Sequence, residues 1–274
     1  MSESLAHSPF TRLRIIGPDA DGIVLVKLAR PEQLNCIDLE MFAELKQLAL
    51  VAEADPDVRV VILTGEGRGF CAGLDLEVAG RLPTLSIEAY MKIQELAGST
   101  IAALRLMAKP MIAAINGAAT GGGLALALAA DIRVASESAR FGVAFTRLGL
   151  SACDVGMSWL LPRIVGLAHA GELMLTGRII DAQAAARIGL TNHVVAADEL
   201  LERAYQVARE IARNSVFAMR LTKQGLQTNV DAPSLHAAIE LENRTQALAA
   251  RSEEMPEVFA RFRQEQAEKR RENA

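Results

Sequence analysis

The sequence predicts an α/β fold, because short β-rich runs alternate with helical patterns up to about residue 195. Two of these runs, VRVVILTG (58–65) and KPMIAAING (109–117), are apolar on both faces, which is typical of parallel strands covered by helices on both sides. Beyond residue 195 the strand signals stop and the chain has helical periodicity. We therefore expect a core region over residues 1–195 and a helical C-terminal region over residues 196–274.

The separate elements follow from the spacing of apolar residues. FTRLRII and GIVLVKLAR predict two strands joined by the turn segment GPDAD. Asp38 can cap the helix that follows, whose apolar residues recur every three or four positions as far as Ala52. A helix is expected over residues 86–107, and GGGLALALAA predicts a second, buried helix. DIRVAS then predicts a further strand.

Composition excludes several classes of protein. The chain of 274 residues is 51% hydrophobic and carries a net charge of −4, which argues against a general nucleic-acid binder. The odd number of cysteines, Cys36, Cys71 and Cys153, suits a reducing compartment and excludes a disulfide framework. The histidines lack metal-ligand spacing, so we expect no metal site. Without a signal-peptide pattern or an apolar run near the roughly 20 residues of a membrane span, we expect a cytoplasmic protein with no membrane partner.

Two glycine-rich loops, in GFCAGLDL and INGAATGGGLALAL, each follow a predicted buried strand and lead into a helical stretch. Glycine lets a ligand approach the backbone, and the N–H groups at a helix start are unpaired and partly positive. Two such groups that converge on one point make an oxyanion hole. The phosphate-loop pattern is absent from both. Tight packing is the other interpretation of each loop taken alone.

Several motifs in order and spacing resemble the crotonase superfamily, also called the enoyl-CoA hydratase/isomerase family. They are RPEQLNCID, VRVVILTGEGRGFCAGLDL, KPMIAAINGAATGGGLALALAADIRVAS, LPRIVG, ELMLTGRIIDAQAAARIGLTNHVV and EIARNS. The resemblance implies a crotonase-like spiral of ββα units, followed by a helical region that builds homotrimers, which can pair into homohexamers. It also implies acyl-CoA substrates, in which coenzyme A is part of the substrate and no separate cofactor is needed.

The resemblance assigns an oxyanion hole to the backbone N–H groups of Leu74 and Gly122, with Gly73 and Gly121 beside the bound thioester. A carbonyl held there becomes enolate-like, so its α-carbon becomes more acidic. One such donor contributes about 3 kcal/mol in the transition state.

Cys36 and Ala72 are expected near the adenine of coenzyme A, chiefly through their backbone, although ordinary loop packing would also account for them. Arg30, Arg68 and Arg81 lie near these loops in the sequence. Solvated surface charge is the simpler interpretation of all three, so we assign no phosphate-binding residue.

The sequence departs from the family's hydratases at both catalytic glutamates. These positions fall on Ala125 and Phe145, and neither side chain can hold a proton; Phe145 is expected to line the acyl pocket instead. LGLSACDVGMSWLLP is similar to the segment of dienoyl-CoA isomerases in which an aspartate moves a proton, which makes Asp154 the candidate acid or base. One extra residue after Gly149 weakens this match. A helix N-cap is the alternative role of Asp154.

Three functions stay open on the sequence. An isomerase that shifts a double bond needs one acid/base group, which Asp154 could supply. A hydratase would need an activated water as well, and therefore a non-standard acid. A protein that binds acyl-CoA without turnover would keep the oxyanion hole alone.

Overall fold

The computed structural model describes Leu5 and residues 9–272, so most of the N-terminal segment considered for a signal peptide lies outside the described residues. The chain divides into two compact units, Met1–Arg209 and Glu210–Ala274. The expected boundary after residue 195 therefore lies earlier than this division. The first unit extends further because α7 (Leu200–Ala212) begins within it and buries Leu200 and Ala204.

The main sheet of the first unit has six strands in the described residues, in the order β1-β2-β3-β4-β6-β9. Their bounds are β1 Leu13–Ile16, β2 Ile23–Leu28, β3 Val60–Gly65, β4 Met111–Ile115, β6 Ile132–Ser136 and β9 His193–Val195. β1 pairs antiparallel with β2, and every later pairing is parallel. All six residues of β3 are buried, as its apolar sequence predicted.

A smaller sheet contains β5 (Ala118–Thr120), β7 (Arg140–Gly142) and β8 (Ile179–Asp181). The chain passes from a strand of the main sheet to a strand of the small sheet and then to a helix: β4, β5 and α4, and then β6, β7 and α5. The turn after β3 follows the same course, because Cys71 forms an isolated bridge with Ala119 of β5. The repeated ββα spiral is thus confirmed.

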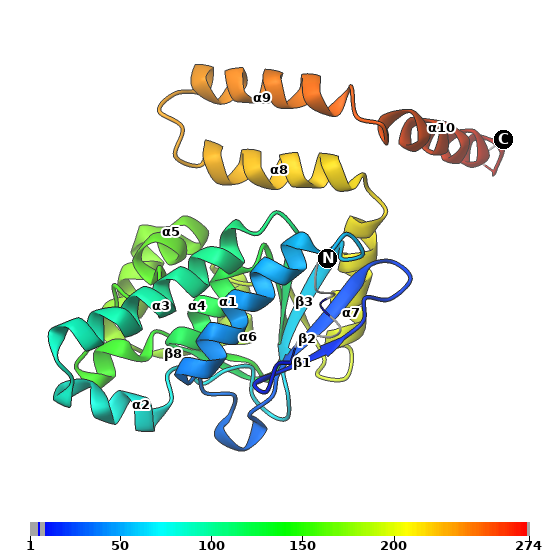
Figure 1. Ribbon diagram of the computed structural model, residues 1–274. Helices are drawn as coiled ribbons and strands as arrows, with labels where there is room; N and C mark the ends of the chain where they lie inside the picture. Colours follow the sequence, from blue (N-terminus) through cyan, green and yellow to red (C-terminus); the bar gives the residue numbers. More distant parts are fainter. Residues whose placement is uncertain (1–4, 6–8, 273–274) are drawn as a thin grey trace. The chain divides into compact units, whose positions relative to one another are not determined.

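The helices of this unit cover the sheets, and Figure 1 shows α1 and α3 beside each other. The bounds are α1 Leu39–Ala54, α2 Leu76–Arg81, α3 Ile87–Leu106, α4 Gly122–Ala129, α5 Met157–Thr176 and α6 Ala182–Arg187, with short 3-10 turns η2 Pro31–Gln33, η3 Leu82–Thr84 and η4 Ala144–Leu148. The cap predicted at Asp38 is confirmed, since its carboxylate accepts from the Met41 N–H at 2.8 Å.

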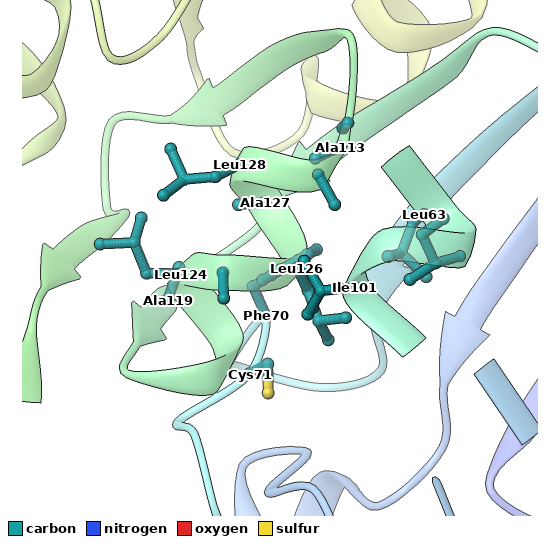
Figure 2. Packing of buried hydrophobic residues seen from close by; sticks show 14 of the residues in the cluster. Leu63, Phe70, Cys71, Ile101, Ala113, Ala119, Leu124, Leu126, Ala127 and Leu128 are labelled. Atoms are coloured by element: carbon teal, nitrogen blue, oxygen red, sulfur yellow. The ribbon is translucent and has the colours of Figure 1, made fainter. Parts of the chain in front are cut away.

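The core of the first unit is centred on α4, in which all eight residues are buried. Figure 2 shows Leu124, Leu126 and Leu128 of this helix within a cluster that also contains Leu63 of β3 and Ile101 of α3. A helix that is apolar on every face must be buried all round. The glycines at its N-terminus are therefore fixed by the packing of the whole unit.

The second unit contains the end of α7 and the helices α8 (Val216–Asn229), α9 (Leu235–Ala249) and α10 (Met255–Glu272). The predicted helical C-terminal region is confirmed. Ser215 and Ser234 cap α8 and α9 with their hydroxyls. Among the described residues, no helix of either unit has the length and apolarity that crossing a membrane requires.

Candidate active site

A cavity of about 110 Å³ lies in the first unit, between the two glycine-rich loops, α3 and the segment before α5. Leu74 and Gly122 both line it, as do Gly73, Gly121 and Phe145. Most of the other lining side chains are apolar, and the polar ones are those of Tyr90, Gln94 and Asp154. Of the residues that the sequence predicted for the site, all except Cys36 therefore line this one cavity.

The first glycine-rich loop runs beside Ile37 as a short parallel bridge. Ile37 N–H donates to the Gly73 carbonyl at 2.8 Å, and Asp75 N–H donates to the Ile37 carbonyl at 2.9 Å. These bonds use the carbonyl before Leu74 and the amide after it. The Leu74 N–H therefore takes no part in the bridge, while the residue itself lines the cavity.

The second loop ends at the start of α4. Gly121, with φ 53° and ψ −120°, is the N-cap residue, and Gly122 is the first residue of the helix. A first-turn N–H has no acceptor within its own helix. The Gly121 N–H donates to the Gly142 carbonyl of β7 at 2.9 Å, which fixes the direction of the backbone immediately before Gly122.

The two loops are joined by backbone contacts that only glycine permits. A Cβ on Gly73, where φ is 101°, would lie 2.8 Å from the Thr120 carbonyl oxygen and 3.6 Å from Gly122 N. A Cβ on Gly123 would lie 2.0 Å from the Cys71 carbonyl oxygen. Such approaches exclude any side chain, so the packing interpretation of the glycines holds. The same packing brings Gly73 next to the Gly122 amide.

An ion pair fastens the first loop to the preceding segment. Arg30 Nη2 lies 2.8 Å from Asp75 Oδ2, and Arg30 Nη1 donates to the Cys36 carbonyl at 2.6 Å. Burial alone would raise the pKa of Asp75, but the Arg30 guanidinium and the Glu77 N–H stabilise the carboxylate, so the net pKa is lowered. The Arg30 side chain is 16% exposed and fully engaged with the loop, so its interpretation as solvated surface charge is wrong.

The predicted adenine-site residues differ in their placement. Ala72 lines the cavity, and its carbonyl accepts from the Thr120 hydroxyl at 2.8 Å. Cys36 is half-buried and lies outside the cavity lining. Arg68 and Arg81 are exposed. Burial raises the pKa of Cys71 to about 12, which keeps this thiol protonated and unsuited to act as a nucleophile.

Asp154 lines the cavity. The alternative prediction, that its side chain caps the following helix, is wrong. The helix α5 begins at Met157 after Gly156, which has φ 77° and provides no side-chain cap. The Asp154 carboxylate instead accepts from the Val155 N–H at 2.9 Å. Val155 itself has φ 42°, a conformation that is costly for a β-branched residue. This backbone directs a carboxylate to the cavity wall rather than onto the helix end.

The environment of Asp154 is apolar, and burial raises the pKa of its carboxyl despite hydrogen bonds from Val155 N–H and the Gln94 side chain. Leu148 and Leu150 line the same cavity. Trp159, five residues after Asp154, is 39% exposed, is not part of the cavity lining, and stacks against the Arg163 guanidinium.

Ala125 and Phe145 are the two positions that the resemblance aligns with the catalytic glutamates of hydratases. Ala125 is fully buried within α4 and does not line the cavity. Phe145, in η4, is 7% exposed and lines the cavity, and its role as a wall of the acyl pocket stays a prediction. Across the described wall of the cavity, Asp154 is the one carboxyl side chain.

Tyr90 and Gln94 were missed by the sequence reasoning. They lie one turn apart on α3, and Ala97 extends the same face of the helix toward the cavity. The positions 90, 94 and 97 have ordinary amphipathic spacing, and two polar residues on such a face could have been noticed. Nothing in the sequence relates that face to Asp154.

The spiral fold and its cavity define a protein of the crotonase fold. The sequence matches the family model for enoyl-CoA hydratase/isomerase over residues 19–272. A Mycobacterium tuberculosis (strain H37Rv) protein named as a probable enoyl-CoA hydratase is 42% identical, over 86% of this chain and 89% of its own. The 1,2-epoxyphenylacetyl-CoA isomerase of Escherichia coli is 37% identical, over 88% of this chain and 92% of its own.

A crystal structure of enoyl-CoA hydratase from Bacillus anthracis superimposes with a TM-score of 0.87 and 32% identity, covering 93% of this chain and 96% of that one. The chain therefore belongs to the enoyl-CoA hydratase/isomerase family, and it is an enzyme of that family.

Proposed function

We propose that this enzyme moves a proton along the acyl chain of an enoyl-CoA and so shifts its double bond, with Asp154 as acid and base. The observation that carries the proposal is the presence of one carboxyl side chain, Asp154, in a cavity that also contains both glycine-rich loops. Isomerisation removes a proton from one carbon and adds a proton to another, so one group is enough, and deuterium from heavy water enters when that group exchanges its proton with the solvent between the two transfers.

The thioester carbonyl is held by the backbone N–H groups of Leu74 and Gly122, with Gly73 and Gly121 closing around it. Support comes from the bridge geometry, which leaves the Leu74 N–H out of the loop's own hydrogen bonds, and from the place of Gly122 at a helix start. Two such donors stabilise the enolate oxygen by about 3 kcal/mol each in a site of low dielectric constant.

Asp154 then carries the proton. As a carboxylate it removes a proton from C2 of a 3-enoyl-CoA, and the electron pair spreads onto the thioester oxygen as a dienolate. The Asp154 carboxylic acid returns the proton at C4, which gives the 2-enoyl-CoA. Burial, which raises the pKa of Asp154, makes the carboxylate a stronger base and the acid easier to retain between the two transfers.

Hydration is the second candidate function, because the Mycobacterium tuberculosis relative is named as a probable enoyl-CoA hydratase. Adding water across the double bond needs a group that activates the water in addition to a proton donor. Ala125 and Phe145 cannot do this, so a hydratase would have to use Asp154 for one task and a non-standard group for the other.

The test is incubation of the purified enzyme with 2-enoyl-, 3-enoyl- and 3,5-dienoyl-CoA in heavy water, followed by product analysis and mass spectrometry. The expected result is a shifted double bond with deuterium uptake, reduced about 10²- to 10⁴-fold in Asp154→Asn. Cys153→Ser is the matched control, because Cys153 is the exposed neighbour and lies outside the cavity lining.

Each other outcome overturns the proposal in a different way. Hydration at a wild-type rate in Asp154→Asn favours the hydratase and excludes Asp154 as essential. Acyl-CoA binding without exchange or turnover on all three substrates favours a protein that binds acyl-CoA and no longer reacts it.

Two further expectations of the resemblance belong to this proposal. The coenzyme A adenine would lie near Cys36 and Ala72, with coenzyme A entering as part of the substrate. The helices of the second unit would pair with those of other copies in a homotrimer or homohexamer. Support for the second comes from apolar side chains that this unit leaves exposed, among them Leu226, Leu235 and Phe262. Sedimentation equilibrium measures the number of copies.

A further inference from the structure

Three polar side chains form a connected chain in an otherwise apolar cavity. Gln94 Nε2 donates to Tyr90 Oη at 3.1 Å, and both side chains line the cavity together with Asp154, whose pKa the Gln94 side chain lowers as a hydrogen-bond partner. Tyr90 and Gln94 come from α3, whereas Asp154 comes from the segment before α5. An ionised carboxylate only accepts hydrogen bonds, so the Gln94 atom that serves Asp154 is the amide nitrogen, which also donates to Tyr90 Oη.

In a mostly apolar cavity, the ionised form of a carboxyl group is stabilised only by the few hydrogen-bond donors that face it. In the described residues Asp154 forms no ion pair within salt-bridge distance, and Tyr90 is the one other titratable side chain that lines the cavity.

The charged groups on the surrounding elements lie elsewhere. Lys92 and Glu95 on α3 are exposed, and the Arg147 side chain on η4 lies against the backbone position of Gly177. The donors to Asp154 are thus the Val155 N–H and the Gln94 amide. The first belongs to the backbone. The second belongs to a side chain, so a substitution can remove it.

We propose that Gln94 is the positioning residue for Asp154: its amide, anchored by the Tyr90 hydroxyl, holds the carboxyl in the cavity and stabilises it in the ionised form. This proposal rests on the proposed function, in which Asp154 begins the reaction as a base. Gln94 lines the same cavity as the acid/base group, and in this proposal it affects the reaction through Asp154. Loss of the amide would leave Asp154 with one donor, the Val155 N–H, and free to adopt other rotamers.

The test is the pH profile of kcat/KM for isomerisation of a 3-enoyl-CoA in Gln94→Leu, which keeps most of the volume and removes the amide. The expected result is a fall in kcat of about ten- to a hundredfold with little change in KM, since a hydrogen bond to a charged group is lost. The acid limb of the profile moves to higher pH by about one unit, because the carboxylate has lost a donor. Glu95→Gln, the exposed neighbour on α3, is the matched control and should leave the profile unchanged.

Two further variants make the result specific. Tyr90→Phe keeps the ring but removes the hydroxyl that anchors Gln94. It should therefore shift the acid limb to higher pH by a smaller amount than Gln94→Leu does. If Gln94→Leu does not fold, Tyr90→Phe becomes the deciding variant. In an Asp154→Asn background, Gln94→Leu should cause no further loss, since Gln94 acts through Asp154.

The failures of the two proposals are distinguishable. Full turnover in Asp154→Asn contradicts the proposed function itself. If Asp154→Asn loses turnover but Gln94→Leu keeps a wild-type pH profile, only the role of Gln94 is overturned. The same holds for a wild-type profile in Tyr90→Phe, if Gln94→Leu does not fold. A lowered kcat without any shift of the acid limb would show a packing role and would also overturn it.

Discussion

The glycine-rich loops and the Asp154 segment line one cavity but are held in different ways. The loops are held by backbone hydrogen bonds between strands and bridges, such as Thr120 N–H to the Cys71 carbonyl at 3.1 Å, and by a buried helix behind them. The Asp154 segment is irregular. It contains Val155 at φ 42° and Gly156 at φ 77°, and its carboxyl is oriented by the Val155 N–H and by Gln94.

This difference separates two tasks of the proposed reaction. Polarising a thioester oxygen requires fixed dipoles, which the core of the fold supplies as part of its own packing. Moving a proton requires a side chain of suitable pKa, which an irregular segment can present without disturbing that core. One set of glycine loops can therefore serve several reactions, and the acid/base segment determines which of them takes place.

Gly123→Ala is expected to have the largest effect, because the new Cβ would meet the Cys71 carbonyl oxygen at 2.0 Å and force the loops apart. Overpacking of this kind costs about 1–3 kcal/mol or more of unfolding free energy. Acyl-CoA binding and turnover should be lost together. Denaturant titration and a binding isotherm measure the two effects.

Gly98→Ala is the matched control for that variant. Gly98 lies within α3, and nothing lies within 4 Å of the position that its Cβ would take. Alanine should stabilise the helix by about 0.5–1 kcal/mol. Equal stability changes in the two variants would contradict the view that the loops are fixed by close backbone packing.

Asp75→Asn should have an intermediate effect on the loop side of the site. It breaks the 2.8 Å ion pair with Arg30 and should lower the unfolding free energy by about 1.5–3 kcal/mol near neutral pH. The folded-state pKa of Asp75 is lowered from its ordinary value of 3.8, so the stabilisation is present above that value. It disappears as the pH falls through the folded-state pKa.

The measurement is the difference in unfolding free energy between wild type and Asp75→Asn across the acid range. Glu77→Gln, at the exposed next-but-one position, should show a much smaller difference. A difference for Asp75→Asn that stays constant with pH would mean that the ion pair does not fasten the loop.

Asp154→Asn should have the smallest effect on stability. The pH dependence of this effect should have the opposite sign to that of Asp75→Asn. Burial raises the folded-state pKa of Asp154 above its ordinary value of 3.8, so the folded state favours the protonated form. The contribution of Asp154 to stability is full below that value and falls as the pH rises through the folded-state pKa. Wild type should therefore lose stability relative to the asparagine variant as the pH increases. A gain over the same range would show that the carboxylate is stabilised by the fold.

The regular elements could be predicted because their signals are local. The apolar strand Val60–Gly65 and the cap at Asp38 were both confirmed, and each depends on neighbours in the sequence. The meeting of the two glycine-rich loops could be expected only from the resemblance to a family, because the strands that bring them together are distant in sequence.

The surroundings of Asp154 could not be predicted from local patterns. An aspartate a few residues before a helix is typical of a cap, and only the positive φ of Val155 and Gly156 turns this one away from the helix end. Gln94 reaches Asp154 from a helix sixty residues earlier in the chain. Contacts of that kind are set by tertiary packing, which leaves no mark on either segment by itself.

The division of tasks within the site is tested most directly in one sample: Asp154→Asn bound to a 3-enoyl-CoA with ¹³C at the thioester carbonyl, in heavy water. Infrared difference spectroscopy reads the carbonyl stretch, and mass spectrometry of the recovered thioester reads deuterium uptake. We expect the stretch to lie below its value in free solution, because the Leu74 and Gly122 amides still polarise the oxygen, and we expect deuterium uptake to be at least about a hundredfold slower than in wild type. A carbonyl stretch at its free-solution value, or deuterium uptake at the wild-type rate, would contradict the account.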